Sequence, residues 1–124
     1  MHERVWEELY IPKDLYQMAF PTGSSWICNP PVLNTDIDFA ILSGDWDKLD
    51  LWCIDNGFKT NYEDYAMEAF RSYKRGPVNL IVTNDETFFR KFGAASLLAK
   101  KLNLLDKEQR IICFDFLMYE PAIL

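Results

Sequence analysis

Histidine is almost absent from this chain. His2 is the only one, so we expect neither a zinc site built on histidine ligands nor a serine or cysteine nucleophile paired with a histidine. Cysteine is also scarce, since Cys28, Cys53 and Cys113 are odd in number, widely spaced and set in apolar segments. This pattern predicts reduced, packed thiols in a cytoplasmic protein, without a disulfide framework. Carboxylates are then the side chains best suited to hold a metal ion.

Long apolar runs are missing as well. No stretch reaches the roughly 18 residues of a membrane-spanning helix. The first ten residues, MHERVWEELY, contain three glutamates where a signal peptide has an apolar core. We therefore expect no membrane association and no secretory leader.

Positive charge is in deficit, because the formal net charge is −6. Extended nucleic-acid binding is therefore not expected. The charge is also unevenly divided: residues 1–70 carry 13 acidic and 4 basic side chains, whereas residues 71–124 carry 6 acidic and 9 basic ones. A basic half facing an acidic half suits one triphosphate or a short polyanion better than a long nucleic-acid track.

Apolar and aromatic residues are abundant, at 49% and 15% of the 124 residues. Such a composition predicts a compact core and excludes a disordered chain. The sequence shows no repeat, linker or low-complexity stretch. Residues 1–124 are therefore expected to form a single domain.

Periodicity and capping residues predict the order of helices and strands. Apolar residues at helical spacing predict helices over residues 3–10, 45–56, 86–102 and 107–119. Proline, glycine and β-branched residues predict strands over residues 15–20, 35–42, 58–62, 69–74 and 77–83. The prediction is an α+β fold, an α/β sandwich in which helices cover a mixed sheet of about four to five strands.

Residues 22–42 combine a tight turn with two spaced acids. Thr22-Gly23-Ser24-Ser25 follows an apolar run, and Asp36 and Asp38 open the next one. Side chains two positions apart in a strand point to the same face, so the two carboxylates are expected side by side. A hard divalent cation such as Mg²⁺ relieves their repulsion. The simpler alternative is a surface turn followed by two solvated aspartates.

The ordered set of Gly23-Ser24 and then Asp36-Ile37-Asp38 resembles the signature of the nucleotidyltransferase superfamily, which includes DNA polymerase β. The resemblance implies that Gly23, Ser24 and Ser25 bind the phosphates of an NTP. It also implies that Asp36 and Asp38 are catalytic and hold Mg²⁺ or Mn²⁺. Two clamped metal ions assist in-line displacement at phosphorus.

Basic residues of the second half supply the remaining charge for such a site. Arg71 and Lys74 are the expected nucleotide-binding cations, and Arg75 is a further one that would neutralise the leaving group.

A third acid, usual in that superfamily on a later core strand, is missing. The matching strand spans residues 77–82, and its only polar interior position is Asn79, which is therefore the third candidate catalytic residue. An amide carries no charge and is no base at neutral pH. Either Glu68 or Asp85 replaces the missing acid, or a bound metal lowers the acceptor's pKa sufficiently, or the chemistry is lost.

Asn79 also has an explanation that needs no metal. If Arg75-Gly76 forms a two-residue hairpin loop, Ser72 lies opposite Asn79. A hydrogen bond between the two side chains across the strands would then account for the asparagine.

Residues 79–85 and 106–110 are similar to small nucleotidyltransferase-like proteins encoded by bacteriophages. That resemblance implies that the asparagine belongs to the group's pattern. It also implies a host-cytoplasmic location and raises the expectation of a host protein partner.

Three functions follow from these patterns. The first is an enzyme that transfers a nucleoside monophosphate from an NTP to an acceptor hydroxyl. The second is a binding module that inhibits a host enzyme or defence complex. The third is an antitoxin-like modification of a partner toxin. Aromatic residues that would anchor a protein interface, if exposed, are Trp26, Trp46, Trp52, Tyr62 and Tyr65.

Overall fold

The computed structural model describes residues 1–33, 35–60 and 70–119. These residues contain a five-stranded sheet in the order β1-β2-β5-β4-β3. The strands are β1 Met18–Thr22, β2 Ile37–Leu42, β3 Lys59–Thr60, β4 Arg71–Arg75 and β5 Val78–Thr83. β2 and β5 are parallel and the other neighbouring pairs are antiparallel. The predicted α+β fold with a mixed sheet is confirmed.

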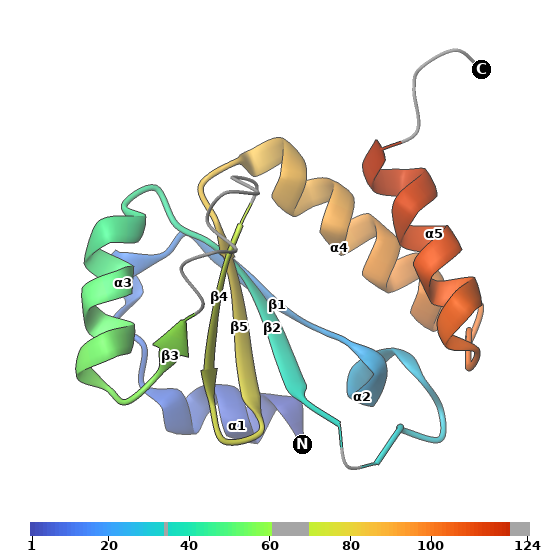
Figure 1. The fold of residues 1–124 in the computed structure, drawn as a ribbon, viewed down its shortest axis with the longest axis horizontal. Coiled ribbons are helices and arrows are strands. Elements are labelled where there is room, and N and C mark those ends of the chain that lie inside the picture. The colour runs from blue at the N-terminus through green and yellow to red at the C-terminus, as the bar shows by residue number, and fades with distance from the viewer. Residues whose placement is uncertain (34, 61–69, 120–124) are drawn as a thin grey trace.

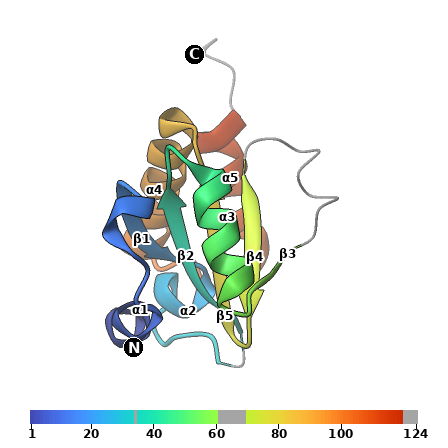
Figure 2. The same cartoon turned by 90° about the vertical axis from the view of Figure 1, so that its left-hand side faces the viewer.

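Helices cover both faces of the sheet (Figures 1 and 2). They are α1 His2–Leu9, the short 3-10 helix η1 Lys13–Leu15, α2 Ser24–Ile27, α3 Trp46–Asp55, α4 Glu86–Lys101 and α5 Lys107–Tyr119. α1 and α3 pack on one face, and α4 packs on the other with α5 beside it. None of the helices within the described residues combines the length and apolar character needed to cross a bilayer.

The alternation of side chains along β2 and β5 divides the sheet into two unlike faces. Phe39, Leu80 and Val82 pack with side chains of α1 and α3 in the main core. The alternate residues of the same strands, such as Asp38 before Phe39 and Asn79 before Leu80, point to the other face. We call the face under α1 and α3 the core face and the face under α4 and α5 the site face.

The three cysteines are free thiols, in agreement with the prediction that no disulfide joins them. Cys53 lies in the main core, where burial raises the pKa of its thiol to about 12.

Capping side chains begin the long helices where the sequence predicted them. The Asp45 carboxylate accepts from Lys48 N at 3.2 Å at the start of α3. The Asp85 carboxylate accepts from Phe88 N at 3.2 Å at the start of α4. Asp106 accepts from Glu108 N at 2.8 Å before α5. Each side chain satisfies a backbone N–H that has no partner within its helix.

The first strand lies further along the chain than predicted. Residues 13–15 form η1, where Leu15 N donates to Pro12 O at 3.0 Å, and β1 continues past Phe20 to Thr22. Pro21 therefore lies inside the strand, although we expected the strand to close there. It is tolerated because β1 is an edge strand, so the missing N–H of proline costs no central ladder bond.

The β4–β5 hairpin closes one residue later than predicted. Arg75 pairs with Val78, so Gly76 and Pro77 form the loop, and Lys74 lies opposite Asn79. The predicted Arg75-Gly76 loop was wrong. Gly76 takes the positive φ of +57° that the turn requires. Pro77 has no N–H to donate to β4, but its carbonyl oxygen accepts from Ile37 N of β2 at 2.7 Å.

Ser72 consequently pairs with Ile81. The predicted Ser72–Asn79 contact is therefore wrong as well. Several expectations fall outside the described residues: the end of the strand predicted over 58–62, the candidate acid Glu68, and the aromatic anchors Tyr62 and Tyr65.

Candidate functional site

The glycine turn and the second aspartate are in direct contact. Gly23 follows β1 with φ +82°, and Trp26 N and Ile27 N donate to its carbonyl oxygen at 3.0 and 2.8 Å as α2 begins. A Cβ at position 23 would lie only 1.9 Å from Asp38 Oδ2. Both the dihedral angle and the space therefore require glycine. The structure brings the turn and the acid into one site, as the sequence motif predicted.

Asp38 is bonded to Asn79 across the parallel strands. The two residues are in register on β2 and β5, and Asn79 Nδ2 donates to Asp38 Oδ1 at 3.0 Å. Burial raises the pKa of the Asp38 carboxyl above its ordinary value, the Asn79 bond opposes this, and the Asp36 charge adds to it. Asn79 therefore occupies the strand position where a third acid was expected, and it contacts Asp38, the second acid of the pair.

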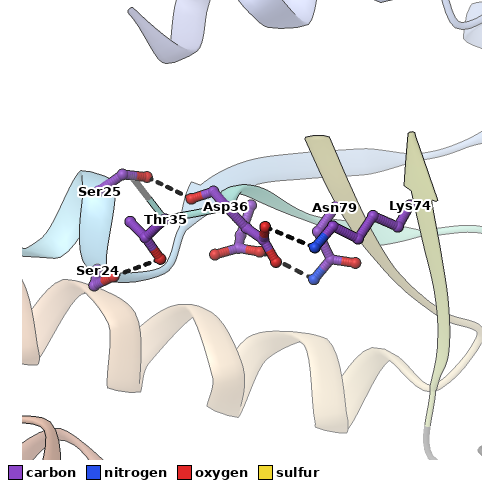
Figure 3. A network of polar contacts seen from close by, with 7 residues as sticks. Ser24, Ser25, Thr35, Asp36, Lys74 and Asn79 are labelled. Carbon is purple, nitrogen blue, oxygen red and sulfur yellow. Dashed lines mark hydrogen bonds and ion pairs between the residues drawn. The ribbon is translucent and has the colours of Figure 1, made fainter. Parts of the chain in front are cut away.

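Asp36 is paired with a lysine from the next strand. Lys74 Nζ lies 2.9 Å from Asp36 Oδ1, and Figure 3 shows Lys74 reaching from β4 toward Asp36. The two side chains are 57% and 38% exposed, so water weakens the pair. Because Lys74 is also in register with Asn79, Asp38, Asn79 and Lys74 form a row across three strands.

The two serines have different roles. Ser24 Oγ donates to Thr35 Oγ1 at 3.4 Å, whereas Ser25 Oγ donates to the backbone oxygen of Asp36 at 2.9 Å (Figure 3). Ser25 is buried, so its hydroxyl ties the turn to the segment that carries the first aspartate. Ser24 lines the neighbouring pocket and is the serine that a phosphate could reach.

His2 lies beside Ser25, a contact that the sequence did not predict. His2 Nε2 is 3.4 Å from Ser25 Oγ, and both residues are buried. We expected no serine nucleophile paired with a histidine, and this contact between two buried residues is a structural one. The Ser25 hydroxyl also donates to Asp36 O, so Ser25 links the start of the chain, the turn and the segment of the first aspartate. Burial lowers the pKa of His2.

Arg71 and Arg75 point away from the aspartates. The Arg71 guanidinium lies 4.2 Å from the Trp46 ring centroid, and that of Arg75 lies 4.6 Å from the Phe58 ring centroid. Both residues share the core face with Tyr73, because strand positions two apart point the same way. The structure therefore brings Lys74, and not Arg71, to the predicted site. The odd spacing from Arg71 to Lys74 contained this information.

Asp85 is too distant to act as the third acid. Asn79 lies near the start of β5, and about 13 Å of strand separates it from Thr83 at ~3.3 Å per residue. Asp85 follows Thr83 and caps α4. Within residues 1–33, 35–60 and 70–119, no three His, Cys, Asp or Glu side chains are grouped so that they could hold a metal ion.

The donor set nevertheless suits a hard cation. Asp36 and Asp38 supply carboxylate oxygens, and the Asn79 amide carries a carbonyl oxygen, all of the kind that Mg²⁺ and Mn²⁺ prefer. Burial is the main cause of the raised pKa of Asp38, and the charge of Asp36 adds to it; a bound cation would favour the ionised form of both acids. These three residues would hold the ion.

A pocket of about 360 Å³ opens beside this site. Gly23, Ser24 and Asp38 line one side, and Lys107 and Arg110 approach from α5. The sequence analysis did not single out these two basic residues as candidates for the site. Nothing in the local pattern indicates that α5 folds back over the sheet.

Comparisons with known proteins reveal a shared fold. No protein-family model and no curated protein matches the chain. Among solved structures, it is similar to the crystal structure of the conserved protein GrpB from Enterococcus faecalis, with a TM-score of 0.50 and 18% identity over 93% of this chain and 84% of that one. At this identity the match shows the fold alone. It supports no finer assignment.

Proposed function

We propose that this protein binds a nucleoside triphosphate together with Mg²⁺ or Mn²⁺ at the Gly23–Asp38 site and transfers the nucleoside monophosphate to an acceptor hydroxyl. The observation that carries the proposal is the contact between the positive-φ glycine and the Asp38 carboxylate, with a pocket of about 360 Å³ beside it. A backbone without a Cβ lets phosphate oxygens approach closely to a pair of metal-binding carboxylates.

The residues of the site divide the work of binding. Asp36 and Asp38 hold the cation, which when bound neutralises phosphate charge and steadies the leaving group. Gly23 and Ser24 face the polyphosphate. Lys74 lies beside Asp36 and supplies a positive charge for the leaving pyrophosphate.

In the transfer the acceptor oxygen bonds to the α-phosphorus, the bond from that phosphorus to the bridging oxygen breaks, and pyrophosphate leaves. Asn79 cannot take the acceptor's proton, because an amide is no base at neutral pH. The proton therefore passes to water. We expect firm nucleotide binding and slow transfer.

The test measures both steps. Purified protein is titrated with each of the four NTPs plus Mn²⁺ by calorimetry and then assayed for label transfer. We expect Mn²⁺-dependent binding that Asp36→Asn/Asp38→Asn abolishes. Asp14→Asn, an exposed aspartate outside the site, is the matched control and should bind like the wild type. Failure of the wild type to bind any NTP would refute the proposal.

A second candidate is binding to another protein, a host enzyme if the chain is phage-encoded. Two observations favour it: Asn79 replaces the usual third acid, and Ile112, Phe116 and Tyr119 of α5 are 68%, 49% and 68% exposed. Affinity capture distinguishes the two functions. This candidate predicts one stoichiometric partner that survives Asp36→Asn/Asp38→Asn and is lost with Ile112→Asp/Phe116→Asp.

A further inference from the structure

The pocket beside the acid pair has two chemically different ends. Its polar end is formed by Gly23, Ser24 and Asp38, and its other wall is mainly apolar, with Asp115 of α5 as a further acid. The apolar lining comes from the sheet and three helices and comprises Ile27, Ile81, Phe92, Ile111 and Phe114. A volume of about 360 Å³ lies within the range of about 300–1,000 Å³ typical of small-ligand sites. The pocket is larger than a metal-bound phosphate group requires.

Contacts fix the position of Arg110, one of the two basic residues of α5 that line the pocket. Arg110 Nη1 donates to Leu104 O and Leu105 O at 2.9 and 2.8 Å and contacts Cys28 Sγ at 3.2 Å. Cys28 directly follows α2, the helix that Gly23 and Ser24 begin. The Arg110 guanidinium is therefore held at the C-terminal end of α2, one helical turn from Ser24. Lys107 precedes it by one helical turn and also lines the pocket.

The aromatic wall lies further along α5. Phe114 is half-buried, one turn beyond Arg110, and its ring meets that of Phe92 on α4 at 5.2 Å between centroids and 66° between planes. This edge-to-face contact holds the two rings in fixed orientations. A planar, aromatic ligand gains most from fixed rings, because each stacking contact requires a preset face.

We propose that the apolar half of this pocket is a nucleobase-binding slot walled by Phe92, Phe114 and Ile111. This proposal rests on the proposed function. In the orientation that it gives the nucleotide, the polyphosphate lies at Gly23 and Ser24, and the base lies under α5. Lys107 and Arg110 supply positive charge at the phosphate end. The slot assigns a ligand-binding role to α5, which has no counterpart in the Gly-Ser and Asp-x-Asp motif.

The experiment compares a whole nucleotide with its polyphosphate part. ATP, GTP, CTP and UTP are each titrated against inorganic tripolyphosphate, all with Mn²⁺, by calorimetry. We expect at least one NTP to bind the wild type about tenfold more tightly than tripolyphosphate does, because stacking is worth ~1–3 kcal/mol per base. Equal affinities would overturn the slot while leaving a polyphosphate site in place. Binding of neither ligand would overturn the proposed function as well.

Matched substitutions locate the slot. Phe114→Leu should weaken NTP binding about tenfold and leave tripolyphosphate binding within about twofold. Phe116→Leu is the control, because Phe116 is on the same helix but does not line the pocket.

A second pair of variants leaves the packed Phe114 ring in place. Ile111→Gln should weaken NTP binding several-fold, whereas Ile112→Gln should not, since Ile111 and Ile112 are 49% and 68% exposed and only Ile111 lines the pocket. Equal NTP affinity across both pairs would refute the slot.

Discussion

The two faces of the sheet are built from the same strands but differ in chemistry where β2 and β5 begin, although the site face also has a small apolar cluster under α4. On the core face, Tyr73 and Leu80 are completely buried among side chains of α1 and α3. On the site face, the neighbouring positions are Lys74 and Asn79, which carry charge or an amide. Figure 2 shows that α3 covers the first face, whereas α4 and α5 lie behind the second.

The difference shows how a small domain separates stability from binding. Alternation sends each residue of a strand to one face or the other, so one strand can supply both a dry core and a polar site. Asp38 sits directly before the buried Phe39 in β2. The core face can therefore hold the fold while the site face tolerates like charges. Substitutions at neighbouring positions of one strand therefore test the two faces separately.

The largest effect is expected where the core face is emptied. Leu80→Ala should lower the free energy of unfolding by about 3 kcal/mol, because Leu80 is completely buried and its removal leaves a cavity. Ile81→Ala, the next residue and partly exposed on the site face, should cost about 1 kcal/mol. Urea denaturation measures both values. Equal losses would break the division into two faces.

The next effect separates dihedral strain from contact with the acid. Gly23→Ala should cost about 2–3 kcal/mol, since it adds a left-handed φ penalty of ~1–2 kcal/mol to a collision with Asp38. Gly76→Ala has a positive φ of +57° but nothing within 4 Å of the added Cβ, so it should cost only ~1 kcal/mol. Denaturant midpoints report both. If the two glycines cost the same, the Gly23–Asp38 contact is unimportant.

Much of the fold was readable from the sequence because local features determine it. Helix boundaries followed from capping aspartates such as Asp45 and Asp85, whose effect acts over three residues. The meeting of Gly23 with Asp38 followed from a motif. The hairpin register did not, because glycine and proline in succession allow two alternative loop positions.

The wrong hairpin register changed the partner of Asn79 but not the face on which it lies. Moving a two-residue loop by one position changes the partner of Asn79 by two residues, from Ser72 to Lys74. The face is preserved and only the partner changes, so Asn79 was placed on the right face but with the wrong neighbour. The roles of His2 and Lys107 could not be predicted, because both depend on where a distant helix docks.

Adding a third acid should sharpen the difference between the faces. Asn79→Asp replaces the bond to Asp38 by repulsion between carboxylates, so the metal-free variant should lose about 1 kcal/mol of stability. Mn²⁺ should restore it, because three acids bind a divalent cation more tightly; at 100 times the dissociation constant a ligand adds ~2.7 kcal/mol. Thermal melts with and without Mn²⁺ measure the shift.

Asn84→Asp is the control for charge alone. Asn84 is exposed in the turn after β5 and lies outside the pocket, so the same charge change there should create no new response to Mn²⁺. A Mn²⁺ shift of the same size in both variants would mean that the ion binds the acidic surface in general. Asp36, Asp38 and Asn79 would then not form a specific metal site.

The smallest effect concerns the pH dependence of stability without metal. In the folded protein the pKa of Asp38 is raised above 3.8, chiefly by burial. As pH rises from about 3.8 through that higher value, the unfolded chain releases its proton first and the folded protein keeps it. The folded state then binds more protons, so stability falls with rising pH over this window.

Asp38→Asn keeps an oxygen for Asn79 and removes this loss. In EDTA, the free energy of unfolding of Asp38→Asn, measured with urea, should rise relative to that of the wild type between pH 3 and pH 7. That of Asp14→Asn should not. If Asp38→Asn instead loses stability toward neutral pH, the ionised carboxylate is well solvated or well paired, and the site face is less strained than its burial suggests.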